Sequence, residues 1–327
     1  MAFPFENCDL NTKKQINDID AKLSELEAEL KDLHDQMREA VGPEKAYIAG
    51  KEKKVIEKMD GLGNERASLL TTCGMSLSNW SGYSIKGGDT ELTGISAEWT
   101  VPNVTPSSTG KDTFSATWIG LSGPPDDTSN VNIIQVGTSQ FILNNKPVFY
   151  AWLELFPANP ENFCKKGTTN CVTNVPISLM PANIADTLPV KPGDLIRASI
   201  QKMPFNNNRW RIFLMNSTQG WGISKIRQYN DTSGTPLKHS FADFILENPS
   251  RPPNELANYG AVTFKKCRVN GNNANFSNNQ SLVMVFDSSF SIIPGGQNGD
   301  IMSIPSEPGS SGDTFSISFG ANKPPRP

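Results

Sequence analysis

The sequence has 327 residues, about twice the length of a typical domain, so it allows one large domain or two. Hydrophobic residues make up 37% and charged residues 19%, which is ordinary for a chain with a buried core, and no run of 18 apolar residues occurs that would span a membrane. The net charge of −3 gives no electrostatic reason to expect a nucleic acid or a membrane as a partner. The first residues lack the basic and apolar regions of a signal peptide.

Charge and turn-forming residues divide the chain into two parts. Residues 1–72 carry 11 Lys and Arg and 15 Asp and Glu, whereas the other 255 residues carry only 19 and 18. Of the 24 prolines, 22 lie after residue 72, as do 22 of the 26 glycines. We therefore expect a boundary near Cys73, with one domain over residues 1–74 and a second over residues 75–327.

The first part has the heptad spacing of a coiled coil. Its apolar residues alternate three and four positions apart, and they are Ile16, Ile19, Leu23, Leu26, Leu30, Leu33 and Met37. After Gly42 and Pro43, a second and weaker series follows through Ile48, Val55, Met59, Leu62 and Leu69. This pattern predicts an antiparallel helical hairpin that frays or bends at Gly61 and Gly63. Its role is open between a spacer or homo-oligomerisation element and a propeptide or lid.

The second part changes to a period of two. Runs that alternate between two faces, rich in β-branched and aromatic residues, predict antiparallel strands. Eight such runs occur, at residues 93–101, 112–119, 148–155, 195–200, 210–214, 261–264, 282–286 and 314–319. Because no helical pattern intervenes, we expect an all-β sandwich or barrel.

The sequence offers little material for metal or histidine chemistry. The only histidines are His34 and His239, and no HExxH or CxxC motif is present, so we expect no metal, no other cofactor and no serine or cysteine triad. Among the five cysteines, Cys164 and Cys171 have a spacing suited to a small disulfide.

A carboxyl group must then carry any catalysis, helped by an amide or a hydroxyl. Three glutamates lie inside apolar strand patterns: Glu98, Glu154 and Glu247. Each is either a solvated outward position or part of a cleft, where partial desolvation raises the pKa of the carboxyl group. Gln135 similarly places an uncharged amide within the apolar run Ile-Ile-Gln-Val-Gly.

A series of motifs between residues 79 and 267 resembles the glutamic peptidase family, the eqolisins. They include Ser-Ala-Glu-Trp-Thr-Val-Pro at 96–102, Tyr-Ala-Trp-Leu-Glu-Leu-Phe-Pro at 150–157 and Ala-Asp-Phe-Ile-Leu-Glu-Asn-Pro at 242–249, in the family's order. The resemblance implies a jelly-roll-like sandwich of two curved antiparallel sheets. It also implies a secreted, pepstatin-insensitive acid endopeptidase that acts on polypeptides, although no signal peptide is visible here.

The resemblance assigns the catalytic pair to Gln135 and Glu247. Glu247 would take a proton from the attacking water and return it to the leaving amine, while Gln135 would stabilise the tetrahedral intermediate.

Five further positions match cleft residues of the family, and we expect them to bind or support the substrate: Trp118, Trp152, Glu154, Ser122 and Tyr150. Ser122 and Tyr150 depart from the family, which has acidic residues at these two positions. Fewer buried carboxylates would move the working pH upward or leave the fold less suited to strong acid.

Two other functions remain open. A sandwich without catalytic activity would bind peptides or glycans on the same scaffold, because a fold alone does not fix a function. A glycosidase is a third alternative, for which no second acid is evident opposite Glu247.

Overall fold

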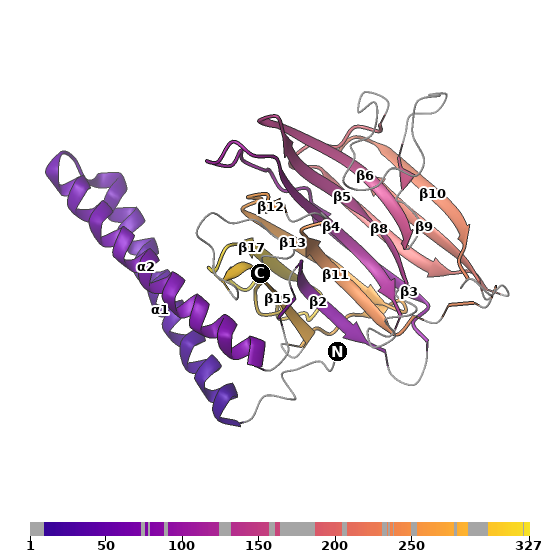
Figure 1. Ribbon diagram of the computed structural model, residues 1–327, viewed down its shortest axis with the longest axis horizontal. Coiled ribbons are helices and arrows are strands. Elements are labelled where there is room, and N and C mark those ends of the chain that lie inside the picture. Colours follow the sequence, from indigo (N-terminus) through magenta and orange to yellow (C-terminus); the bar gives the residue numbers. More distant parts are fainter. Residues whose placement is uncertain are drawn as a thin grey trace.

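The protein, seen in a computed structural model, is a curled antiparallel β-sheet with two helices at its N-terminal end (Figure 1). The structure describes residues 10–327 except 73–75, 78, 88–90, 124–131, 157–160, 164–186, 205–207, 231–233, 235, 238, 250–253, 278–279, 287–299 and 323. The predicted Cys164–Cys171 disulfide lies outside the described residues.

The charged first part forms helices α1 (Leu10–Glu39) and α2 (Pro43–Thr72), which lie side by side in Figure 1. Gly42 has a φ of 60°, the left-handed conformation that ends many helices, and Pro43 begins the next one. The apolar series packs together between the helices as Ile19, Leu23, Leu33, Ala40, Ile48, Val55 and Met59. The supercoiling of a coiled coil remains a prediction.

The helix α2 continues without a break to Thr72, so it does not fray at Gly61 or Gly63, and a bend there stays a prediction. Leu62 and Leu69 pack against the interhelical cluster on either side of Gly63, and this packing offsets the low helix propensity of glycine. Neither helix, over the residues described, has the length and apolar character that a membrane span requires.

The sheet has two halves. In order of hydrogen bonding, the first half contains β10 (Trp221–Gln228), β9 (Arg209–Asn216), β8 (Leu195–Lys202), β3 (Gly94–Thr100), β13 (Ala261–Val269), β17 (Phe315–Phe319), β16 (Ile301–Pro305) and β15 (Ser281–Val285). The second half contains β7 (Glu161–Asn162), β6 (Lys146–Phe156), β5 (Ile133–Leu143), β4 (Thr113–Ser122), β11 (Phe241–Glu247) and β2 (Trp80–Lys86). Three short strands complete the sheet: β1 (Ser76–Leu77) pairs in parallel with β15, β12 (Glu255–Leu256) in parallel with β4, and β14 (Asn272–Asn273) antiparallel with β13.

The two halves are one continuous sheet, so the expectation of two separate sheets is not confirmed. β15 pairs with β16 of the first half and also with β2 of the second, which joins all seventeen strands. The sheet curls over a single apolar core that takes residues from both halves, among them Trp99, Ile119, Val136 and Phe264. All eight predicted strand segments are strands in the structure.

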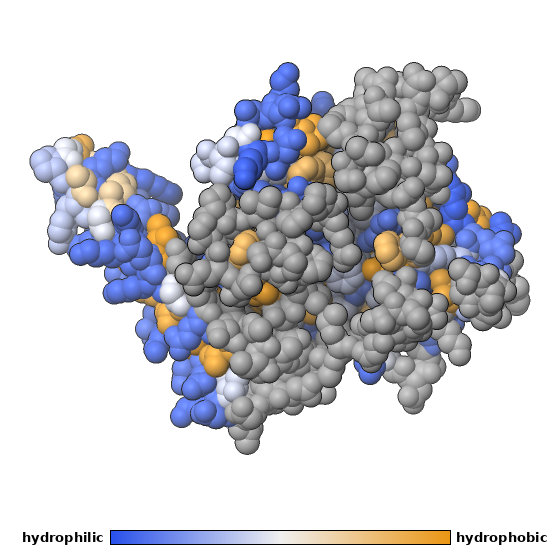
Figure 2. All heavy atoms as spheres, viewed as in Figure 1, coloured by the Kyte–Doolittle hydropathy of each residue, from blue (hydrophilic) through white to orange (hydrophobic). Residues whose placement is uncertain are grey.

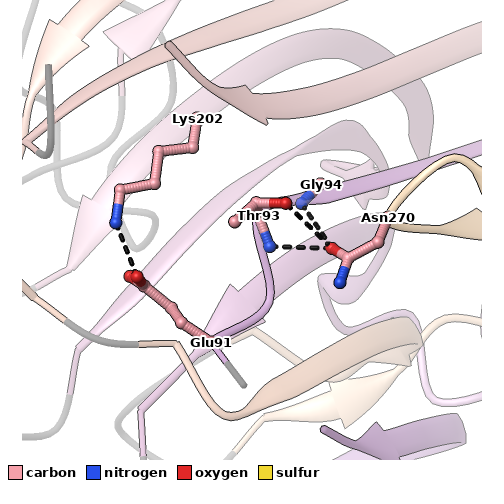
Figure 3. A network of polar contacts seen from close by, with 5 residues as sticks. All are labelled: Glu91, Thr93, Gly94, Lys202 and Asn270. Carbon is pink, nitrogen blue, oxygen red and sulfur yellow. Dashed lines mark hydrogen bonds and ion pairs between the residues drawn. The ribbon is translucent and has the colours of Figure 1, made fainter. Parts of the chain in front are cut away.

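Side-chain hydrogen bonds add to the strand pairing where β3 begins and β13 ends (Figure 3). Asn270, at a φ of 51°, accepts hydrogen bonds through its Oδ1 from the backbone N–H groups of Thr93 at 2.8 Å and Gly94 at 3.1 Å. Nearby, Lys202 donates to Glu91 at 2.6 Å. Asn tolerates the left-handed conformation, so one residue both turns the chain and binds the start of β3.

The helices meet the sheet where its two halves join. Ile16 of α1 packs with Val283, Val285, Ile301 and Ile304 of β15 and β16. Figure 2 shows mainly hydrophilic side chains over the rest of the helices in that view, with apolar ones near the body.

Candidate active site

The candidate residues lie on the face of the second half that points away from the main core. Along β4, Ile119 and Leu121 enter the core, so Trp118, Gly120 and Ser122 point to the opposite face. That face carries a second apolar cluster containing Trp118, Trp152, Tyr150 and Ile245.

Strand register places two acids and the predicted catalytic amide in one row across the sheet. Glu154 of β6 is opposite Gln135 of β5, Gln135 is opposite Gly120 of β4, and Gly120 is opposite Asp243 of β11. Because opposite residues in an antiparallel pair point to the same face, Glu154, Gln135 and Asp243 all share the face of Trp118. We call Glu154, Gln135, Gly120 and Asp243 the acid row.

Gln135 and Glu154 are in direct contact. The Gln135 Nε2 donates to Glu154 Oε2 at 2.5 Å, and both residues are buried. The Oε1 atom of Gln135 is also buried and has no hydrogen-bond partner among the described residues. Burial, reinforced by the negative charge of Glu247, raises the pKa of Glu154 to about 7.

Glu247 is held in place by two N–H donors. The Nε1 of Trp118 donates to Glu247 Oε2 at 2.7 Å, and the Nδ2 of Asn79 donates to Oε1 at 3.4 Å. Glu247 ends β11 and is partly exposed. These contacts favour the ionised carboxylate and leave it accessible.

Trp118 spans the distance between the two proposed catalytic side chains. Gln135 and Glu247 lie on the strands that flank β4, and Glu247 is opposite Ala116, four residues from Gly120. Atom Cζ3 of Trp118 lies against Gly120, where an added Cβ would be 2.8 Å away, and its Nε1 reaches Glu247. The indole therefore extends from Gly120, the residue opposite Gln135, to the carboxylate of Glu247.

Asp243, at the other end of the acid row, is fully enclosed. It accepts hydrogen bonds from the hydroxyl groups of Ser122, at 2.7 Å, and Ser84. Burial raises the pKa of Asp243 to about 6, although both hydroxyl groups oppose this shift. Ser122, predicted to contact substrate, is thus engaged with Asp243.

The other predicted site residues lie on the same face but have different surroundings. Tyr150 and Trp152 are buried in the apolar cluster, and burial raises the pKa of Tyr150 to about 12. Trp118 is also fully buried, which makes it a support for Glu247 rather than an exposed platform. Glu98 belongs to the outer face of β3, where it pairs with Arg197 at 3.1 Å and Lys266 at 3.2 Å, so the solvated alternative holds for this glutamate.

Sequence reasoning assigned no role to Asn79, to Asp243 as a titrating group, or to Gly120 and Gly137. An added Cβ at Gly137 would lie 2.5 Å from the Cβ of Trp118, so Gly137 makes room for the base of that side chain and Gly120 makes room for its indole. The available signal was positional: Trp118, Gly120 and Ser122 alternate along one strand, with Gly137 two residues after Gln135. Among the described residues, no three His, Cys, Asp or Glu side chains come together as a metal site.

Residues 78–289 match the sequence model of the peptidase A4 family. Among solved structures, scytalido-glutamic peptidase with a transition-state analogue inhibitor is 22% identical, with a TM-score of 0.48, over 74% of this chain and 98% of that one. SCP-B, an eqolisin in complex with the tripeptide Ala-Ile-His, is 21% identical with a TM-score of 0.43 over 74% and 98%. Aspergilloglutamic peptidase from Aspergillus niger is 18% identical with a TM-score of 0.37 over 63% and 99%.

Comparison with curated protein sequences gives no match. The family match spans well over half of the chain and contains every predicted site residue. The chain belongs to the peptidase A4 family and is a glutamic endopeptidase, as its sequence motifs imply.

Proposed function

We propose that this endopeptidase cleaves polypeptides with Glu247 as general base and acid and with Gln135 as the stabiliser of the tetrahedral intermediate. The observation that carries the proposal is the setting of Glu247. It is a partly exposed carboxylate, held by Trp118 and Asn79, on the same sheet face as the buried amide of Gln135.

The reaction follows from the protonation states of these groups. Ionised Glu247 takes a proton from a water molecule as the water oxygen bonds to the scissile carbonyl carbon. The carbonyl oxygen becomes negatively charged, and the amide N–H of Gln135 donates to it. Glu247 then returns the proton to the amine nitrogen, the carbon–nitrogen bond breaks, and the carboxylate is restored.

Trp118 has a positioning role in this mechanism. Its Nε1 donates to Oε2 of Glu247, so the other carboxylate oxygen, Oε1, is the one that faces the weaker donor Asn79 at 3.4 Å. A long contact of this kind is easily exchanged for a water molecule. We therefore assign proton transfer to Oε1.

We place the working pH on the acid side of neutrality. Glu154 and Asp243 lie in the acid row with pKa values raised to about 7 and about 6. Both are therefore largely neutral below pH 5, so neither adds a negative charge to the face that carries Glu247.

The alternative of a peptide-binding module is separated from a peptidase by one variant. Glu247→Gln removes the base and keeps the size of the side chain, so we expect at least a hundredfold loss of hydrolysis of an unfolded, labelled protein between pH 3 and 7. Peptide binding by the variant, measured by fluorescence anisotropy, is expected to persist. Pepstatin and a chelator are expected to leave wild-type cleavage unchanged. Binding by a wild-type protein that cleaves nothing at any pH would favour the binding module.

A further inference from the structure

We propose that Glu154 is a positioning residue whose proton decides which way the amide of Gln135 points. The inference rests on the proposed function, because it concerns how Gln135 is made ready to donate to the substrate. Glu154 thus sets the orientation of the Gln135 amide, which is more specific than the general supporting role expected from the sequence.

The contact between the two side chains is the first observation. The separation of 2.5 Å between Gln135 and Glu154 is shorter than the usual range for N–H···O bonds and normal for O–H···O bonds. An O–H···O bond forms here if the amide is rotated by half a turn, so that its oxygen accepts from a protonated Glu154. Rotation of this kind exchanges two groups of almost equal size and needs no movement of the backbone.

The buried, unpartnered Oε1 of Gln135 is the second observation. A buried amide oxygen without a partner is unfavourable, because its lost hydrogen bonds to water are not replaced, so the orientation in which Nε2 donates to Glu154 leaves a defect. In the rotated orientation, Glu154 satisfies the oxygen and the NH₂ group takes the vacated position. That NH₂ group then lacks an acceptor among the described residues, and the carbonyl oxygen of a bound peptide supplies one once the side chains around this buried position make room for it.

The environment determines that Glu154, and not Glu247, keeps the proton. Glu154 is buried, has one neighbour in hydrogen-bond contact and feels the negative charge of Glu247, whereas Glu247 is partly exposed and receives two N–H donors. Two interacting carboxyl groups in different surroundings share one proton over the pH range between their two titrations. In that range Glu247 is a base and Glu154 is an acid, as the reaction requires.

Other titratable groups near Glu154 do not share this role. Tyr229 interacts electrostatically with Glu154, but burial raises its pKa far above neutrality, and its hydroxyl group donates to the backbone of Phe156. Asp243, in the same row, is separated from Gln135 by Gly120 and is engaged by Ser84 and Ser122. Among the described side chains, Glu154 alone is hydrogen-bonded to Gln135.

Three variants test the inference through the pH profile of kcat/KM. Wild-type activity is expected to fall as pH rises through about 7, when Glu154 ionises and captures the amide N–H. Glu154→Gln is permanently neutral, so we expect activity within about tenfold of wild type at pH 4–5 and a decline that moves upward by at least one pH unit. Glu154→Leu cannot accept or donate, so we expect a loss in kcat of about 10²–10³ at every pH with little change in KM. Asp243→Asn is expected to leave the decline near pH 7 in place.

A second readout does not need activity. The side-chain NH₂ signals of Gln135, observed by NMR in glutamine-labelled protein and assigned with Gln135→Ala, are expected to titrate near pH 7 in the wild type and to be insensitive to pH in Glu154→Gln. Signals that do not titrate in the wild type, or a decline in activity that moves with Asp243→Asn instead, would overturn the inference. Failure of the proposed function is distinguishable, because hydrolysis would then survive Gln135→Ala or Glu247→Gln whatever the behaviour of Glu154.

Discussion

At the scale of single residues, two glycines give Trp118 the room that it needs to reach Glu247: Gly120 lies against its indole and Gly137 against its Cβ. An added Cβ at Gly137 would lie 2.5 Å from both the Cβ of Trp118 and the carbonyl oxygen of Thr117, a distance that forces one of them to move. The position of the proposed catalytic carboxylate, Glu247, thus depends on the absence of a side chain at Gly137.

We therefore expect Gly137→Ala to destabilise the protein by about 1–3 kcal/mol, the usual cost of overpacking a buried site. It should also lower kcat/KM by at least about tenfold, because the displaced indole no longer holds Glu247. Urea unfolding and peptide hydrolysis measure the two effects. Gly222→Ala is the control, since its new Cβ would meet nothing nearer than 3.6 Å. Equal behaviour of the two variants would contradict the argument.

At the scale of elements, the helices are placed to brace the sheet and not to cover the site. The main contacts of α2 with the sheet are on β1, β15 and β16, whereas the site residues come from β4, β5, β6 and β11. Ile16 is 1% exposed where α1 packs on β15 and β16, close to the point at which the two halves of the sheet join. This arrangement favours a structural or oligomerisation role for the helices over a lid.

We expect Ile16→Ala to weaken the packing of the helices on the sheet by about 2–4 kcal/mol of free energy and to leave the rate of hydrolysis unchanged. Hydrogen exchange should rise in α1 and α2, because their attachment is weakened, and not in β4 or β5. Val41→Ala, at a position 78% exposed, is the control and should change neither readout. A rise in activity for Ile16→Ala alone would support a lid or propeptide.

Strand alternation explains why so much of the sheet was predictable from the sequence. Strands with one polar face, such as β3 and β8, show a period of two that the sequence displays directly. β5 is different: all eleven of its residues are buried, so no alternation marks its length beyond the apolar run around Gln135. The joining of the halves through β15 was not predictable, because it depends on pairing between segments about 200 residues apart, Leu282 with Gly82.

The site was partly predictable for a similar reason. Gln135, Glu154 and Glu247 stand out in the sequence as polar residues within apolar strand patterns, and the motifs of the family assign the catalytic pair to Gln135 and Glu247. The role of Trp118 as a donor to Glu247 was not predictable, because it depends on the register that sets β4 beside β11. Its spacing in the sequence gives no sign of a partner 129 residues away.

At the scale of the whole molecule, the free energy of unfolding depends on buried titratable groups, and these groups change it in opposite directions as the pH falls. The folded-state pKa values of Glu154 and Asp243 are raised. Their contribution to the stability of the folded protein is therefore present at acid pH and is lost as pH rises through about 6 to 7. His239 is buried beside the rings of Trp210 and Tyr229, and burial, with the nearby charge of Lys202, lowers its pKa to about 3. Its contribution is present above pH 6.5 and is lost as pH falls toward 3.

His239→Phe removes the pH-dependent contribution of the histidine to the stability of the protein. Between pH 6.5 and 3 the unfolded chain binds a proton that the folded protein excludes, at a cost of up to about 1.4 kcal/mol per pH unit. We therefore expect the variant to gain stability relative to wild type as pH falls from 7 to 4, measured by urea unfolding at both values. A difference in stability that does not change with pH would show that His239 is not the acid-sensitive group.

The central claim is that Glu247 is the base, and the most direct measurement is hydrolysis of an unfolded, labelled protein from pH 2 to 8 by three matched proteins. They are the wild type, Glu247→Gln and Glu98→Gln, the last of which makes the same chemical change in a strand glutamate paired with Arg197 and Lys266 on the outer face. The account predicts that Glu98→Gln stays within about twofold of wild type, as expected for a surface ion pair, and that Glu247→Gln loses at least a hundredfold at every pH. Cleavage by Glu247→Gln at the rate of Glu98→Gln would contradict it.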